Sequence, residues 1–188
     1  TGPAGVTSLK LDGDDTELEF IRDGASLGDL IVNYRVDSGD LTEFETAIAA
    51  SKGQVESGHR SSTSYAVSYL IGSRERPELK LVEEFEWDQD GLIWRIEFAN
   101  VSERPIEIGD IALPEVINTR GSTYQTRLNM HRLIARHGSF IYWVRADGSG
   151  DRLVMTPSAG TALEYFERGR IAFIHSAFSG ASEQRGTW

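Results

Sequence analysis

The side chains that could do chemistry gather between residues 127 and 139. Two histidines and three arginines fall within these thirteen positions: Arg127, His131, Arg132, Arg136 and His137. We expect this segment to be loop-like and to lead into an aromatic strand. Sugar hydroxyls bond to planar polar groups and sugar C–H faces pack on rings, so the mixture is typical of carbohydrate binding. The alternative is that these groups pair with acidic strands or with a second domain, and composition alone favours that alternative.

Several other kinds of catalytic signature are missing from the sequence. It has no GxSxG elbow, no P-loop, no Rossmann glycine fingerprint and no HExxH motif. It also has no cysteine, which excludes a thiolate zinc site and a cysteine nucleophile. The four histidines, at 59, 131, 137 and 175, lack the i, i+4 spacing of a helical metal site. We therefore expect no metal and no cofactor.

Charge is divided unevenly along the chain. The net charge is −10, with 23 acidic and 10 basic residues up to position 110, and 6 acidic and 9 basic residues after it. All nine of the later cations are arginine, which suits carboxylates, phosphates and sugar hydroxyls, although arginine use can also reflect genome composition. The acidic balance argues against a nucleic-acid partner and against an anionic membrane surface. No apolar run reaches the roughly 18 residues of a membrane span.

Strand signals dominate the chain and predict an all-β fold. Thr16–Arg22 alternates apolar and acidic residues, and Ser62–Ile71 is rich in Tyr, Val and small hydroxyl residues. Short apolar runs separated by Gly, Pro, Ser and Asp recur to the end of the chain. The spacing predicts a single antiparallel β-sandwich domain. Helix signals are confined to two short segments, Leu41–Ala50 and Tyr124–Arg136.

The clearest local prediction is a β-hairpin around Asp90-Gly91, a strong signal for a tight turn. Period-2 alternation predicts one shared apolar face, which comprises Leu79, Leu81, Phe85, Trp87, Leu92, Trp94, Ile96 and Phe98. A two-residue loop places Trp87 opposite Trp94, and Glu86 opposite Arg95 on the outer face. A four-residue loop shifts the partners by two positions and preserves the faces.

Glu83 falls on the apolar face of this hairpin. A lone carboxylate in such a place needs a partner or a position at the sheet edge, because burying an unpaired charge is costly. We interpret Glu83 as a structural residue.

The amino-acid sequence of the second half of the chain resembles that of a known family. The stretch HRLIARHGSFIYWVRADGSGDRLVMTPSAGTALEYF, from His131 to Phe166, is similar to the N-terminal β-sandwich of an uncharacterised bacterial family of six-hairpin glycosidases. The matching pieces are Ile134–Arg145, Asp147-Gly148, Leu153–Pro157 and Gly160–Phe166, with weaker likeness at Ile108–Pro114 and Gly28–Leu30. The resemblance covers about half of the chain.

This resemblance implies a supersandwich followed by an (α/α) toroid that carries the catalytic carboxylates. No series of helical hairpins follows in this chain, so we expect residues 1–188 to be a single β-sandwich domain of a longer protein, inactive alone. No catalytic residue is assigned. The substrate-binding candidates are Arg127, His131, Arg132 and His137, with His131 and Arg132 toward the cleft. The expected partners are carbohydrate and the missing (α/α) domain, and the expected location is secreted or periplasmic.

Three functions are consistent with these expectations. The first is a non-catalytic sandwich domain of a glycoside hydrolase that lends a loop to the substrate cleft. The second is a stand-alone carbohydrate-binding module, and the third is the sandwich domain of a polysaccharide lyase. A module needs an exposed aromatic platform, whereas a lyase needs a Tyr or His base beside an Arg or Asn that neutralises a uronate. A shared fold does not decide among these chemistries.

Overall fold

The protein is built from antiparallel β-strands, as the sequence predicts. The computed structural model describes residues 5–14, 18–36, 45–48, 54–89, 91–114, 117, 128–135, 138–148, 152–156, 163–168, 171–176 and 185–187. The strands are β1 (Ile31–Val36), β2 (Glu45–Ile48), β3 (Gln54–Arg60), β4 (Ser64–Gly72), β5 (Pro77–Trp87), β6 (Leu92–Asn100), β7 (Ile106–Pro114), β8 (Leu128–Ala135), β9 (Gly138–Arg145), β10 (Leu153–Met155), β11 (Leu163–Arg168), β12 (Ile171–Ser176) and β13 (Arg185–Thr187). The described residues contain no helix, and hence none that could cross a membrane.

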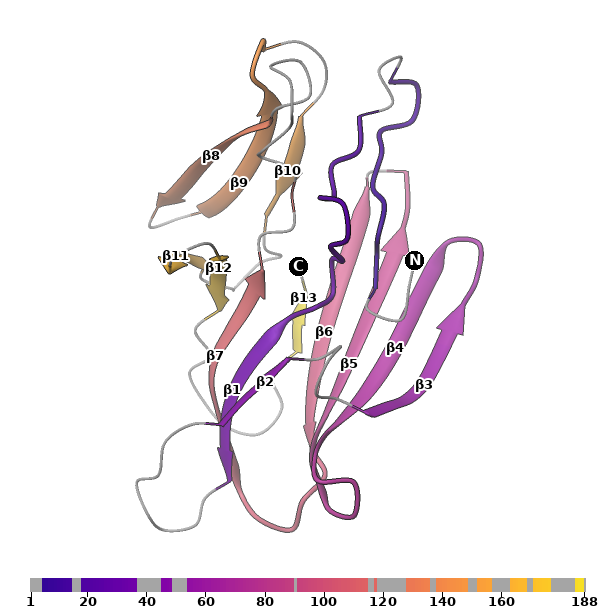
Figure 1. Ribbon diagram of the computed structural model, residues 1–188, viewed down its shortest axis with the longest axis vertical. Coiled ribbons are helices and arrows are strands. Elements are labelled where there is room, and N and C mark those ends of the chain that lie inside the picture. The colour runs from indigo at the N-terminus through magenta and orange to yellow at the C-terminus, as the bar shows by residue number, and fades with distance from the viewer. Residues whose placement is uncertain are drawn as a thin grey trace.

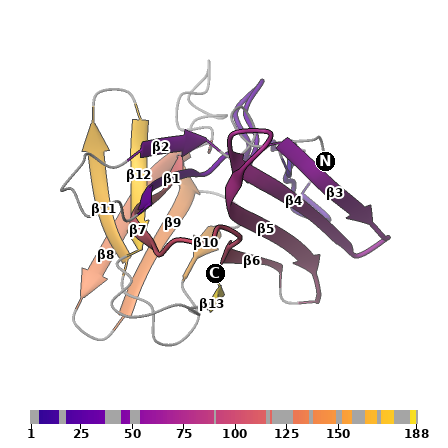
Figure 2. The same ribbon diagram turned by 90° about the horizontal axis from the view of Figure 1, so that it is seen from below.

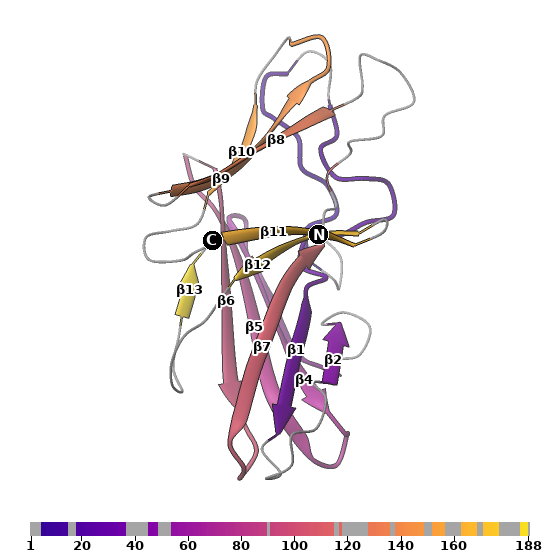
Figure 3. The same ribbon diagram turned by 90° about the vertical axis from the view of Figure 1, so that its left-hand side faces the viewer.

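The strands form three sheets (Figure 1). Sheet A has the order β13-β6-β5-β4-β3, sheet B has the order β11-β12-β7-β1-β2, and a small sheet has the order β10-β9-β8. Seen from below, sheets A and B lie opposite one another (Figure 2). From the side, β1 and β7 run along β5 and β6, while the small sheet lies at the upper end (Figure 3). This is a β-sandwich with an added sheet at one end.

The core lies on the inner face of sheet A. Alternate residues of β5 are buried, and they include Leu79, Leu81 and Phe85. The rings of Tyr65, Phe85 and Trp94 stack across three strands, with centroids 6.3 and 5.3 Å apart. Because period-2 alternation puts every second side chain on one face, the apolar pattern of the sequence is sufficient to bury this face.

The predicted hairpin is confirmed, with the longer of its two possible turns. Phe85 pairs with Trp94 and Trp87 with Leu92, so the loop has four residues and Trp87 does not face Trp94. The side chain of Asp88 explains this choice, because Asp88 Oδ1 accepts a 2.9 Å hydrogen bond from the Gly91 amide. Gly91 has a φ of 144°, a region open mainly to glycine. The shared apolar face is preserved in either register.

Arg95 lies opposite Glu84 rather than Glu86 in this register. Its guanidinium nevertheless contacts both, at 2.6 Å from Glu86 and 3.4 Å from Glu84. The predicted ion pair with Glu86 is therefore present as a diagonal contact across the outer face of sheet A.

Both predicted helices are wrong where the structure describes them. Within Leu41–Ala50, Glu45–Ile48 is strand β2 and pairs with β1. Within Tyr124–Arg136, Leu128–Ala135 is strand β8 and pairs with β9 along its whole length. Helix propensity is a weak preference, and the backbone hydrogen bonds of a ladder outweigh it once a neighbouring strand is in place.

Candidate functional site

Two of the four predicted binding residues lie on strand β8. His131 is paired with Tyr142 of β9, and Arg132 with Ile141. The expectation that this part of the segment is a loop is therefore wrong, because eight consecutive residues form a ladder with β9. Arg127 and His137 lie outside the described residues. Neighbouring positions of a strand belong to opposite faces, so positions 131 and 132 are on different faces of the small sheet.

The face that contains position 131 is the outer face of the small sheet. Tyr142 is central to it, paired with residue 131 on one side and with Val154 of β10 on the other. Val154 is 55% exposed and Tyr142 is half-buried. The exposed Arg152 holds its guanidinium carbon 6.0 Å from the centroid of the Tyr142 ring, within the range of a cation–π interaction.

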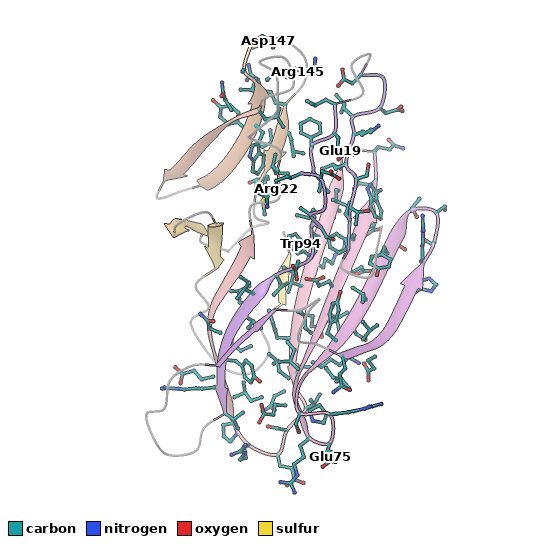
Figure 4. The ribbon with its side chains drawn as sticks, viewed as in Figure 1. Glu19, Arg22, Glu75, Trp94, Arg145 and Asp147 are labelled. Atoms are coloured by element: carbon teal, nitrogen blue, oxygen red, sulfur yellow. The ribbon has the colours of Figure 1, made fainter. Side chains whose placement is uncertain are left out.

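The opposite face of the small sheet is buried. Leu128 and Trp143 are almost fully enclosed, and Leu153 is partly enclosed. Arg145 ends this face, and its Nη2 donates to both carboxylate oxygens of Asp14, at 2.7 and 2.6 Å. Figure 4 shows Arg145 and Asp147 at the upper end of the sheet. The ion pair joins β9 to the N-terminal segment, so the outer face is supported by a fixed layer.

The N-terminal segment is in turn held by Glu19. Its carboxylate accepts hydrogen bonds from the Leu9 and Ile21 amides and from the Ser8 hydroxyl, at 2.8, 2.9 and 2.6 Å. Burial acts to raise the pKa of Glu19, but these hydrogen bonds and the charge of Lys10 together lower it below its usual value. Glu19 therefore acts as a structural anion beneath the small sheet, not as a proton donor.

A second unusual group lies far from this face, in the core of sheet A. Glu83 is fully buried on β5, and neither of its oxygens has a hydrogen-bond partner among the described residues. The expectation of a partner or an edge position is wrong, because β5 is the middle strand of sheet A. Burial, and then the charge of Asp29, raise the pKa of Glu83 well above its usual value. Both causes favour the neutral form of Glu83, and its side chain is enclosed in the core.

Metal chemistry finds no support in the part of the chain that the structure describes. No three His, Asp or Glu side chains of that part come together as metal ligands would. The outer face of the small sheet can instead offer an aromatic ring, an arginine fork and a short apolar flank. Such a set can hold a sugar by stacking and by hydrogen bonds.

The fold is shared with a solved polysaccharide lyase. The two structures align with a TM-score of 0.70 at 17% sequence identity. The alignment covers 98% of this chain and 30% of the lyase chain, so the present chain spans less than a third of the length of that enzyme. At such low identity the likeness shows the fold alone.

Sequence comparison identifies a family for this chain. The profile described as "Family of unknown function (DUF5695)" matches residues 14–182. No curated protein sequence matches the chain.

Proposed function

This chain belongs to the DUF5695 family, and we propose that it is the carbohydrate-binding β-sandwich domain of a polysaccharide-degrading enzyme whose catalytic groups reside on a second domain. The observation that carries the proposal is the fold likeness, in which almost the whole chain corresponds to less than a third of a polysaccharide lyase. A chain that forms one part of such an architecture has a role beside the catalytic centre. Under this proposal the second domain is the (α/α) partner expected from the sequence.

Two parent enzymes fit the proposal. The resemblance of residues 131–166 favours a six-hairpin glycosidase, whereas the structural likeness favours a polysaccharide lyase. Because the structural likeness extends over 98% of the chain, we propose the lyase as the parent. A stand-alone binding module is the remaining candidate, and the half-buried Tyr142 with its neighbouring Arg152 is the observation in its favour.

Three carboxylates of strand β5 are poorly placed for a chemical step. Glu83 is enclosed in the core, and Glu84 and Glu86 are held by Arg95 on the outer face of sheet A. Glycoside hydrolysis requires two carboxyl groups about 5–10 Å apart across the scissile bond, and both must reach the sugar. A buried acid and two ion-paired carboxylates do not meet that requirement.

The outer face of the small sheet is the proposed contact with the glycan. Tyr142 supplies the ring against which a sugar can stack, and Val154 extends the apolar surface beside it. Arg152 supplies charge, and no described carboxylate forms an ion pair with it. We therefore include acidic sugars among the glycans to be tested.

The test is binding of the isolated chain to a panel of neutral and uronate-containing polysaccharides, measured by affinity electrophoresis and calorimetry. Tyr142→Ala should weaken binding by about tenfold, equal to about 1.4 kcal/mol, because a stacking ring is lost. Val55→Ala is the matched control, since Val55 is an exposed apolar residue on β3 in sheet A. Equal loss in both variants, or no binding to any glycan, would reject the proposed face.

Catalysis is tested separately. The purified chain should cleave none of the same polysaccharides, as judged by reducing ends and by the ultraviolet absorbance of unsaturated products. Turnover that a single Asp or Glu substitution abolishes would show that the sandwich itself carries the catalytic groups.

A further inference from the structure

We propose that Glu83 is a proton-operated lock inside the sandwich: in its neutral form it allows sheet A to close against the segment that enters β1, and loss of its proton opens that contact. This inference concerns the core and is independent of the proposed sugar face. It assigns a conformational role to the acidic side chain that is buried in the core of the described residues.

The position of Glu83 leaves it no route to water. On β5 it lies between the buried Leu81 and Phe85 on the same face. On the neighbouring strands it pairs with Val67 of β4 and Ile96 of β6, and both are buried. A charge in this place would lose its hydration without gaining a partner, and that cost keeps the carboxyl neutral.

The groups around Glu83 make its ionisation more unfavourable. Asp29 approaches from the segment that enters β1, and its Oδ1 is buried with no hydrogen-bond partner in the part of the chain that the structure describes. From β4, Tyr65 and Tyr69 are close enough for Glu83 to raise the pKa of each, after burial itself. From β6, the residue opposite Glu83 is the apolar Ile96, which offers no hydrogen bond to a carboxylate. No Lys or Arg in the described residues offsets the charge of Glu83.

Ionised Glu83 would therefore set a second negative charge against Asp29 across the two layers. Like charges in a medium of low polarity repel strongly, and the phenol groups of Tyr65 and Tyr69 offer only dipoles in return. Separation of β1 from sheet A would admit water to both carboxylates and relieve the repulsion. The contact that opens first is thus the one between the β1 entry segment and β5.

The direction of the pH effect follows from proton linkage. The pKa of Glu83 is raised in the folded state above the ordinary 4.5, so the folded protein binds more protons than the unfolded chain once the pH exceeds that ordinary value. The Glu83 contribution to stability is complete below this pH and decreases as the pH rises through the folded-state pKa. Between the ordinary pKa and the folded-state pKa of Glu83, the unfolding equilibrium constant should rise about tenfold per pH unit.

The experiment is denaturant unfolding of the whole chain from weakly acidic to weakly alkaline pH. Wild type should show the rise in the unfolding constant, and Glu83→Gln, which cannot ionise, should lose it. Glu84→Gln is the matched control, since Glu84 is the next residue of β5 and lies in the ion pairs of the outer face. Asp29→Asn should end the rise at a lower pH because it removes the repelling charge. A wild-type slope retained in Glu83→Gln would overturn the proposal.

Two measurements on the wild-type protein guard against a variant that fails to fold. Infrared spectroscopy should show a protonated carboxyl band at neutral pH, and its absence would overturn the proposal. Hydrogen exchange at rising pH should accelerate in Ile31–Val36, beyond the intrinsic pH effect, before it does so in the β5–β6 hairpin. Simultaneous loss of protection in both would show global unfolding instead of a lock, and would also count against the proposal.

Discussion

Two buried ionisable groups, Arg145 in the small sheet and Glu83 in sheet A, are accommodated in opposite ways. Arg145 is 8% exposed, and its guanidinium donates hydrogen bonds to both carboxylate oxygens of Asp14. Glu83 is fully buried and meets no cation among the described residues, and burial, then the charge of Asp29, raise its pKa well above the usual value. A buried group can therefore be tolerated either by pairing or by protonation, and the two solutions respond differently to mutation and to pH.

The difference matches the composition of the two regions. Sheet A buries an apolar face along several long strands. The packing of that face is extensive enough to tolerate one buried carboxyl group. The small sheet has only three strands and packs on the N-terminal segment through a small apolar surface. The hydrogen-bonded ion pair between Arg145 and Asp14 fixes the orientation of the two parts. We infer that sheet A depends on packing, whereas the small sheet depends on its connection to that segment.

The largest effect is expected from packing in sheet A. Trp94 is 4% exposed and stacks on Phe85, so Trp94→Ala should lower the free energy of unfolding by about 3–5 kcal/mol. The measurement is denaturant unfolding monitored by far-ultraviolet circular dichroism. An unchanged midpoint would mean that this ring does not face the core.

The next effect is expected at the ion pair of the small sheet. Asp14→Asn removes the carboxylate charge that pairs with the buried Arg145 guanidinium and should lower the free energy of unfolding by about 3 kcal/mol, near the lower limit for such pairs because both side chains retain slight exposure. Glu107→Gln, which breaks the exposed pair with Arg35, is the control and should cost about 1 kcal/mol or less. Equal costs would remove the distinction between the two pairs.

A smaller effect of opposite sign is expected at Glu83. Glu83→Leu replaces an unsatisfied buried acid with an apolar side chain of similar length, and should raise the free energy of unfolding by about 1–2 kcal/mol at neutral pH. The same denaturation assay measures it. A loss of stability would indicate that the carboxyl has a favourable interaction in the core.

The smallest effect is expected on the outer face of sheet A. Arg95→Gln breaks contacts with Glu84 and Glu86, but all three side chains are more than a third exposed. Water and salt screen such pairs, so the loss should stay below about 1 kcal/mol and should vanish at high ionic strength. A larger loss, insensitive to salt, would mean that this network is as important as the pair of Arg145.

The parts of the fold that can be predicted from the sequence are those with a strong local alternation of apolar and polar residues. Strict alternation in residues 79–98 was sufficient for the faces of the β5–β6 hairpin, because a shift of register by two preserves them. The length of the turn is harder to predict from the sequence, because it depends on the hydrogen bond that the Gly91 amide donates to the Asp88 side chain. Strands β2 and β8 were mistaken for helices because their pairing partners, β1 and β9, are a property of the tertiary structure and leave no mark in the local sequence.

The candidate site was only partly accessible from sequence. The cluster of Arg and His residues drew attention to β8, yet Tyr142 and Arg152 were not singled out. They come together through the β8–β9–β10 register, which a single sequence does not reveal. The aromatic run that follows the cluster was the available signal, because alternation within it separates the buried Trp143 from the half-buried Tyr142.

Strand β3 has a consequence for the behaviour of the domain in concentrated solution. It is the edge strand of sheet A, and among the described strands it pairs only with β4. Such an edge can template a second molecule and seed fibres. Here a bulge between Val55 and Ser57 breaks the ladder, and charge is added by Glu56 within the bulge and by Arg60 at the end of the strand. The edge is thereby shielded against intermolecular strand addition, although Val55 is an exposed apolar side chain within it.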